Sequence, residues 1–229
     1  MRLNIRRPIT SYSKVQRMIG WLVRNRAHQF RRASRSGKKL LNVGCGPNLV
    51  EAYINLDYAW RPGLDLCCDI TRGIALPDGS LDGIYTEHCL EHISFQQCLK
   101  VLKEFHRLLK PGGGVRIAVP DGGLYLQIYV RWKNGQRDVE FPYIGSEGQQ
   151  DKVEDSMVGF SPMMAVNRIF RGYGHQFCYD NESLSNMLHW AGFAQIQKVD
   201  FGKGRFPALL IDSELRAPQS LYMEAIKPG

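Results

Sequence analysis

The sequence Leu40-Leu41-Asn42-Val43-Gly44-Cys45-Gly46-Pro47 joins a short apolar run to two glycines that are one residue apart. The apolar run predicts a buried β-strand that ends at the glycines. Glycine lets the backbone approach a ligand closely, and the exposed N–H groups beyond the strand can receive an anionic group such as a carboxylate. An ordinary tight turn would look the same, so the loop needs support from residues elsewhere in the chain.

Two acidic residues end the next two predicted strands. The strand near Tyr53–Leu56 is followed by Asp57, and the strand near Leu64–Cys68 by Asp69. Ligands of an open parallel sheet bind outside the carboxyl ends of the strands. Asp57 there can accept both hydroxyls of a ribose, and Asp69 can accept from an adenine amino group. The alternative for each is a turn residue or a helix cap.

The rest of the chain alternates strands with helices, which favours an α/β fold with a parallel sheet. Further strands are expected at residues 82–86, 115–119, 193–201 and 220–226, and helices at about 95–109 and 181–190, the latter with Asp180 as its N-cap. Residues 120–179 look irregular and are rich in aromatic side chains. We interpret about 122–179 as an insert that caps a substrate, with an aromatic core as the alternative.

The N-terminal arm, residues 1–37, is strongly basic. Residues 1–39 contain twelve lysines and arginines and no acidic residue, although the net charge of the whole chain is only +8. Residues 11–33 predict one amphipathic helix whose apolar stripe is Val15, Met18, Ile19 and Leu22. We expect this stripe to pack on the body, residues 38–229, near the ligand cleft. Contact with nucleic acid or an anionic membrane is the less favoured alternative.

Apolar runs and cysteine spacing limit the remaining possibilities. Residues 18–23 form an apolar stretch too short for a membrane span or a signal-peptide core, so we expect a cytoplasmic protein. The six cysteines include no C-x-x-C pair, which predicts free thiols and neither a metal site nor disulfides. Leu49 replaces the third glycine of a dinucleotide fingerprint, which disfavours a NAD enzyme.

Several motifs together resemble the class I S-adenosylmethionine-dependent methyltransferases, in particular the small methyltransferase type 11 group. In chain order they are L-N-V-G-C-G-P, I-N-L-D, D-I-T, L-P-D-G-S-L-D-G-I-Y, E-H-C-L-E-H, L-L-K-P-G-G and V-P-D. The resemblance covers Leu40–Asp121 well and extends to His175–Phe193. It implies a Rossmann-like, doubly wound and mostly parallel seven-stranded sheet with an antiparallel last strand, and S-adenosyl-L-methionine as cofactor.

The resemblance also implies cofactor contacts in the first half of the sheet. Gly44, Cys45 and Gly46 match the loop under the methionine part of the cofactor. Asp57 matches the acidic residue on the ribose, and Tyr58 matches the neighbour that packs on the nucleoside.

Further contacts are implied at the next two strand ends. Asp69 and Ile70 match the pair at the adenine, and Glu87 and His88 match the strand end beside the reacting methyl group. The short connection at residues 48–52 departs from the family's usual long helix.

Methyl transfer needs little from the protein beyond placement of the acceptor, because the sulfonium is already activated. A hydroxyl acceptor also needs a base, for which His88, His175 and Asp121 are the candidates. His92 is interpreted as structural. We expect a small-molecule or glycan acceptor, possibly anionic, and an O- or N-methylation. A binding or non-methylating role is the alternative, and the lack of a D/N/S-P-P-Y/F/W motif makes a nucleic-acid acceptor less expected.

Overall fold

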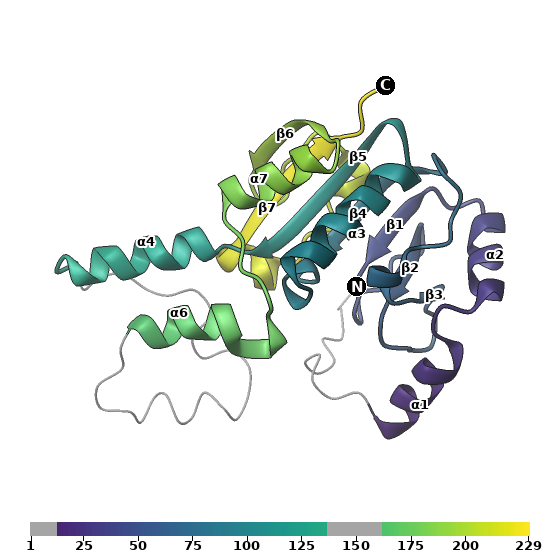
Figure 1. Ribbon diagram of the computed structural model, residues 1–229, viewed down its shortest axis with the longest axis horizontal. Helices are drawn as coiled ribbons and strands as arrows, with labels where there is room; N and C mark the ends of the chain where they lie inside the picture. The colour runs from purple at the N-terminus through teal and green to yellow at the C-terminus, as the bar shows by residue number, and fades with distance from the viewer. Residues whose placement is uncertain (1–12, 137–161) are drawn as a thin grey trace.

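A seven-stranded sheet forms the centre of the computed structural model, which describes residues 13–136 and 162–229 (Figure 1). The strands lie in the order β3-β2-β1-β4-β5-β7-β6. Pairing is parallel from β3 to β5, whereas β7 runs antiparallel to both β5 and β6. The bounds are β1 Leu40–Val43, β2 Tyr53–Asp57, β3 Leu66–Cys67, β4 Leu81–Glu87, β5 Leu109–Pro120, β6 Ala194–Val199 and β7 Ser220–Ile226. The predicted fold class is confirmed.

Most of the helices begin where the sequence supplies a cap. Ser13, Ser94 and Asp180 each accept a hydrogen bond from the backbone at the third helical residue, and that residue's side chain reaches back to the cap. The helices are α1 Lys14–Val23, α2 Ala27–Arg35, α3 Phe95–Leu108, α4 Gly122–Lys133, α6 Pro162–Arg171 and α7 Asn181–Trp190. No helix of the described ranges combines the length and the apolar composition needed to cross a membrane.

The two faces of the sheet are covered differently. Leu41 and Ile84 belong to the main core, which also contains Phe105 of α3 and Leu188 of α7. The alternate residues of the strands point to the opposite face, as the pleat requires. There Tyr53 and Tyr85 pack against Leu209 of the short 3-10 helix Pro207–Leu209, in the connection between β6 and β7.

A buried ion-pair network holds this connection against the sheet. Arg116 interrupts the apolar run of β5 and is fully buried. Its guanidinium pairs with Asp212 in the connection and, at 3.0 Å, with Glu224 on β7. It also donates to the backbone oxygens of Asp200 and Lys203. One arginine on β5 therefore joins β7 and two parts of the β6–β7 connection, at a position where the apolar run alone would place an apolar residue.

The arm consists of two helices, so the prediction of one helix over residues 11–33 is wrong. The chain breaks at Asn25, whose φ of +58° lies in the left-handed region that asparagine adopts more readily than most residues. Asn25 donates its backbone N–H to Cys67 O at 3.0 Å and accepts from the Asp69 N–H at 2.9 Å through its side chain. Gln29 accepts the Cys67 N–H. The arm thereby pairs the exposed edge of β3.

The expected docking stripe of the arm is also wrong. The exposed fractions of Val15, Met18 and Leu22 are 59%, 58% and 48%. Phe30 and Ala33 of α2 are buried in the main core instead. Because the break at Asn25 turns the chain, α2 and the break contact the body, while only Ile19 of the predicted stripe is half-buried and its other three residues stay exposed.

The insert is more regular than the sequence suggests. Outside residues 137–161, which the structure does not describe, it contains α4 and α6, and these two helices pack together at the end of the sheet opposite the arm (Figure 1). Tyr125 and Ile128 of α4 and Ala165 and Ile169 of α6 form a core of their own. The expectation of an irregular segment is therefore wrong for α4 and α6, because the many aromatic residues obscured the helical spacing of the buried side chains.

Candidate cofactor and acceptor site

The glycine loop and the end of β2 are joined by hydrogen bonds. The carboxylate of Asp57, at the end of β2, accepts the Gly46 N–H at 2.8 Å and the Ala59 N–H at 2.7 Å. Gly44 and Cys45 donate their N–H groups to Leu56 O. The connection to β2 contains no helix, as expected from its length. Asp57 therefore fixes the shape of the loop that the sequence assigns to the cofactor.

The two glycines of the loop have different surroundings. Gly44 has a φ of +68°, and a Cβ there would lie 2.5 Å from the Cys89 sulfur. Gly46 has a φ of +52°, and a Cβ there would meet no described atom within 4 Å. Gly44 is thus needed where β1 meets the loop after β4, whereas Gly46 borders open space. Burial, and then the charge of Asp57, raise the pKa of the intervening Cys45 thiol, which keeps it neutral.

The arm contacts two of the predicted cofactor residues. The Arg24 guanidinium lies 3.6 Å from the centre of the Tyr58 ring, and Arg24 Nε donates to Tyr58 O at 3.0 Å. Tyr58 is otherwise exposed. The Asp69 carboxylate accepts hydrogen bonds from the backbone N–H and the hydroxyl of Thr71 and so caps the 3-10 helix Ile70–Arg72. The backbone N–H of Asp69 donates to the side chain of Asn25. Ile70 is buried.

β4 ends at the half-buried Glu87, and the buried His88 follows it. Glu87 accepts the Ser213 N–H at 3.0 Å, and burial raises the pKa of its carboxyl. His88 has a left-handed φ of +48°, which is uncommon for a side chain with a Cβ. Its Nε2 lies 2.7 Å from Ser220 Oγ, at the start of β7. Burial holds the pKa of His88 well below its usual value, so the imidazole is neutral.

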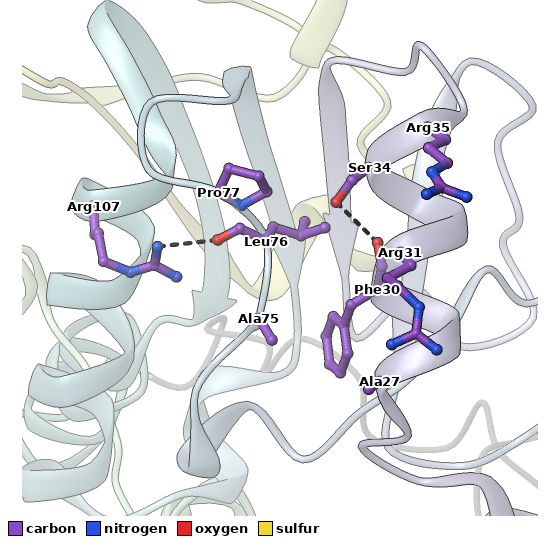
Figure 2. Close-up of a pocket in the computed structure, with 9 residues that line it drawn as sticks. All are labelled: Ala27, Phe30, Arg31, Ser34, Arg35, Ala75, Leu76, Pro77 and Arg107. Atoms are coloured by element: carbon purple, nitrogen blue, oxygen red, sulfur yellow. Dashed lines mark hydrogen bonds between the residues drawn. The ribbon is translucent and has the colours of Figure 1, made fainter.

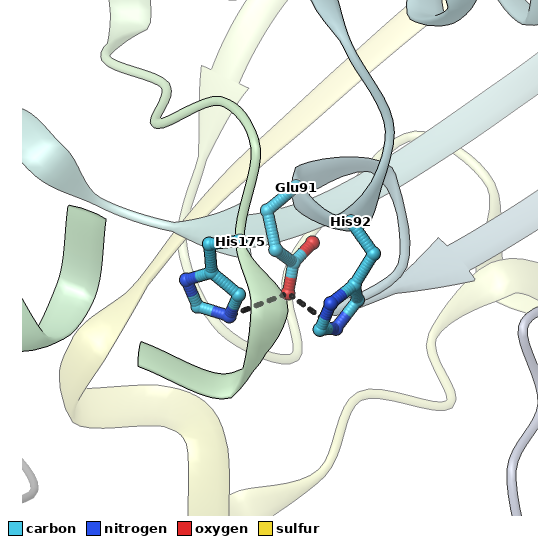
Figure 3. Close-up of side chains that lie close together, drawn as sticks. All are labelled: Glu91, His92 and His175. Atoms are coloured by element: carbon cyan, nitrogen blue, oxygen red, sulfur yellow. Dashed lines mark ion pairs between the residues drawn. The ribbon is translucent and has the colours of Figure 1, made fainter. Parts of the chain in front are cut away.

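A carboxylate that the sequence analysis did not single out connects these histidines. Glu91, in the 3-10 helix Leu90–His92, is 1% exposed, and neither of its carboxylate oxygens has a hydrogen-bond partner among the described residues. His88, His92 and His175 surround it at 3.6, 3.9 and 4.0 Å from their ring nitrogens to Oε1. Figure 3 shows His92 and His175 on opposite sides of the carboxylate. The motif E-H-C-L-E-H contained the signal, because an acidic residue inside an apolar turn is rarely buried without a reason.

Burial dominates the protonation of this cluster. It raises the pKa of Glu91 to about 8 and lowers that of His92 to about 4. The pKa of His175 is lowered for the same reason. His92, interpreted from sequence as structural, therefore belongs to the same group of side chains as His88 and His175.

Asp121 lies apart from these histidines. Its carboxylate accepts the Leu124 N–H at 3.0 Å as the N-cap of α4 and lies 3.8 Å from Lys198 Nζ. Among the described contacts it has none with His88 or His175. The structure therefore brings together two of the three predicted catalytic residues, and the role of each stays a prediction.

A hollow in the described surface lies away from these residues. Figure 2 shows it between α2 and residues 75–77, with a volume of about 580 Å³. Phe30 and Arg31 line it on the arm side, and Leu76 and Arg107 on the other. Arg107 is held by Glu104 and by Leu76 O. None of the residues predicted to bind cofactor lines this hollow.

Comparison with solved structures aligns this chain with proteins of low sequence identity, among them methyltransferases. A SAM-dependent methyltransferase from Archaeoglobus fulgidus aligns with a TM-score of 0.49 and 16% identity over 93% of this chain and 94% of that one. The complex of phosphoethanolamine N-methyltransferase 2 from Haemonchus contortus with S-adenosyl-L-methionine aligns with a TM-score of 0.44 and 14% identity, over 84% of this chain and 49% of that one. A possible exported protein from Bordetella parapertussis aligns with a TM-score of 0.48 and 14% identity, over 88% of this chain and 66% of that one. This chain thus spans from about half to nearly all of the length of these three structures.

The sequence comparisons address the family directly. No match is found among curated proteins. Residues 16–198, which include the glycine loop, both acidic strand ends and the histidine cluster, match a methyltransferase domain. The resemblance predicted from the motifs is thereby confirmed, and the chain belongs to the methyltransferase domain family with S-adenosylmethionine as its cofactor.

Proposed function

We propose that the protein transfers a methyl group from S-adenosylmethionine to a hydroxyl or amine of a small-molecule or glycan acceptor. The observation that carries the acceptor class is the link between the insert and the end of β4. α6 leads through a 3-10 helix, Gly172–Gly174, to His175, whose ring faces Glu91. An acceptor held by the α4–α6 pair would therefore meet the side chains beside the reacting methyl. We expect the reaction to take place in the cytoplasm.

The cofactor would occupy the open side of the glycine loop. Its ribose would contact Asp57, which lies beside Gly46 at the end of β2. Its adenine would lie toward Asp69 and Ile70, and its methionine part along Gly44–Gly46. Arg24 covers one face of the Tyr58 ring, so the nucleoside would pack on the other.

The hydrogen-bond pattern supports a histidine as the base. The Nδ1 atom of His175 lies 2.7 Å from Ile169 O, and a carbonyl can only accept, so Nδ1 carries the proton and Nε2 is free to take one. Ser220 donates its hydroxyl to Arg216 O and so accepts from His88 Nε2, which leaves the lone pair of His88 on Nδ1. Both free nitrogens lie near Glu91, in the 3-10 helix Leu90–His92 that follows β4.

Electrostatics favour an anionic acceptor. Arg216 lies close enough to Glu87, His88 and Glu91 to lower the pKa of each. Its guanidinium makes no hydrogen bond or ion pair within the described residues, so it is available to a carboxylate or phosphate of the acceptor.

Two measurements test the proposal. Calorimetric titration should show S-adenosylmethionine binding and no NAD binding. Panels of sugars, phenols and amines, with and without an acidic group, should then yield S-adenosylhomocysteine and a methylated product. NAD binding in place of S-adenosylmethionine would overturn the cofactor assignment. Cofactor binding with methylation of RNA or DNA alone, or with no product from any panel, would reject the acceptor class.

A further inference from the structure

The segment around Glu91 and the segment that follows His175 are far apart in sequence but are joined by backbone hydrogen bonds. Gln176 and Phe177 donate their N–H groups to Glu91 O, at 2.7 and 3.3 Å. The Gln176 side chain donates to His92 O at 2.8 Å. The rings of His92 and His175 lie edge to face with their centres 5.0 Å apart. The backbone thus fixes both histidines beside the Glu91 carboxylate.

The hydrogen bonds of His175 determine what it offers to Glu91. Since Ile169 O accepts the Nδ1 proton, Nε2 points a lone pair at the carboxylate from 4.0 Å. His88 likewise presents its Nδ1 lone pair at 3.6 Å, because Ser220 accepts its Nε2 proton. A metal-binding histidine commonly gives its second N–H to a backbone carbonyl in this way.

The spacing of these atoms suits a shared ion. One ligand atom from each of Glu91, His92 and His175 lies within 4.8 Å of the others. Nitrogen and oxygen ligands about 2.1 Å from one metal are separated by roughly 3 to 4 Å. Small side-chain shifts would bring all three onto one ion, and a positive charge would satisfy the buried Glu91 oxygens that lack hydrogen bonds.

We propose that Glu91, His92 and His175 form a binding site for one divalent first-row transition metal. Two imidazoles and one carboxylate are ligands that suit Zn²⁺, Fe²⁺ and Mn²⁺, and three protein ligands leave positions open. This site revises the expectation from cysteine spacing that the chain binds no metal. Its use rests on the proposed function: an acceptor oxygen on an open position would lose its proton more readily, and His88 would remain the histidine base because the metal takes the Nε2 lone pair of His175.

Metal binding can be measured without either substrate. The full-length protein is stripped with chelator and titrated with Mn²⁺, and free Mn²⁺ is followed by its electron paramagnetic resonance signal. Manganese is chosen because it prefers oxygen and nitrogen ligands to the six free thiols. We expect one equivalent to bind the wild type, and Glu91→Gln and His92→Ala to weaken binding at least about tenfold. His189→Ala, which removes an exposed histidine of α7, is the matched control.

Thermal unfolding gives an independent readout. Mn²⁺ should raise the melting temperature of the wild type and of His189→Ala but not that of Glu91→Gln. Without metal, Glu91→Gln should melt no lower than the wild type, since it removes a buried group that can be charged. His92→Ala serves as the second variant because the His92 side chain is 38% exposed and its loss leaves no large cavity.

Two outcomes would overturn the proposal. The first is a wild type that binds no Mn²⁺ and no Zn²⁺ under these conditions. The second is equal affinity in the wild type, Glu91→Gln and His92→Ala. Because neither assay contains S-adenosylmethionine, a failure here is distinct from a failure of the proposed methyl transfer.

Discussion

The backbone N–H of Gly46 donates a 2.8 Å hydrogen bond to the carboxylate of Asp57, which is 7% exposed. The same carboxylate accepts the Ala59 N–H through its other oxygen. Asp57 therefore has a structural role in the protein without ligand, since it fixes the conformation of the loop predicted to bind the cofactor. A ribose would use the lone pairs that these two amides leave free.

Replacement of Asp57 should affect both stability and cofactor binding. Asp57→Ala leaves two amides without an acceptor, which costs about 1–3 kcal/mol in the free energy of unfolding. Loss of the ribose contacts should weaken S-adenosylmethionine binding by about 1.5–3 kcal/mol. Urea unfolding and calorimetry measure the two effects. Asp57→Asn keeps one acceptor oxygen and should lose less stability. An Asp57→Ala variant with unchanged affinity would show that the residue only shapes the loop.

The two loop glycines should respond differently to alanine. At Gly44 the left-handed backbone and the close Cys89 sulfur add together, so Gly44→Ala should cost about 2–5 kcal/mol of stability. At Gly46 the backbone term alone applies, about 1–2 kcal/mol. The Gly46 methyl group would project into open space, so its main effect should be weaker S-adenosylmethionine binding. Equal melting temperatures for the two variants would contradict this assignment.

Asn25 should anchor the arm to the sheet edge. Asn25→Ala loses the hydrogen bond from Asp69 and places alanine in a left-handed conformation, which together should cost about 1–3 kcal/mol in urea unfolding. Asn25→Gly removes the backbone strain and isolates the hydrogen bond, so it should be less destabilised. If Asn25→Gly is less stable than Asn25→Ala, the left-handed backbone is not the reason for asparagine at this position.

Two truncations separate the parts of the arm. Deletion of residues 1–19 removes Val15 and Met18 from the exposed face of α1 and should leave the melting temperature nearly unchanged. Deletion of residues 1–35 uncovers the edge of β3 and should lower stability and promote aggregation. Light scattering and thermal unfolding compare the two. If the shorter deletion abolishes binding to anionic vesicles or RNA, α1 serves such a partner; if it lowers stability as much as the longer one, the exposed face contributes to folding.

Arg116 should be indispensable for the β6–β7 connection. Arg116→Leu leaves Asp212 and Glu224 buried without their shared cation, and loss of one partner from a buried ion pair costs about 3–5 kcal/mol. The control is Lys203→Ala, which removes an exposed cation from the same connection. Chemical denaturation gives the comparison. A loss below about 1 kcal/mol for Arg116→Leu would mean that the apolar cluster around Leu209 holds the connection by itself.

The sequence by itself determined the elements whose signals are local. The run before Gly44, the acidic ends of β2 and β3 and the bounds of α7 and β7 follow from apolar periodicity, turn residues and caps, all of which act within a few residues. The alternation of strands and helices then predicted an α/β fold with a parallel sheet, whereas the seven-stranded sheet with its antiparallel last strand was implied by the resemblance. The motifs added the family and its cofactor.

Tertiary structure decided what depends on distant partners. The arm bends at Asn25 because the unpaired edge of β3 offers hydrogen bonds there, which no periodicity within residues 11–33 could reveal. His88 and His92 are sequence neighbours of Glu91, but the imidazole of His175 reaches Glu91 only when the segment after α6 pairs with the Glu91 backbone. Arg116 is tolerated in a central strand because Asp212 and Glu224 arrive from elsewhere. A buried charge is stable only with its partners in place, and their placement is a property of the folded chain.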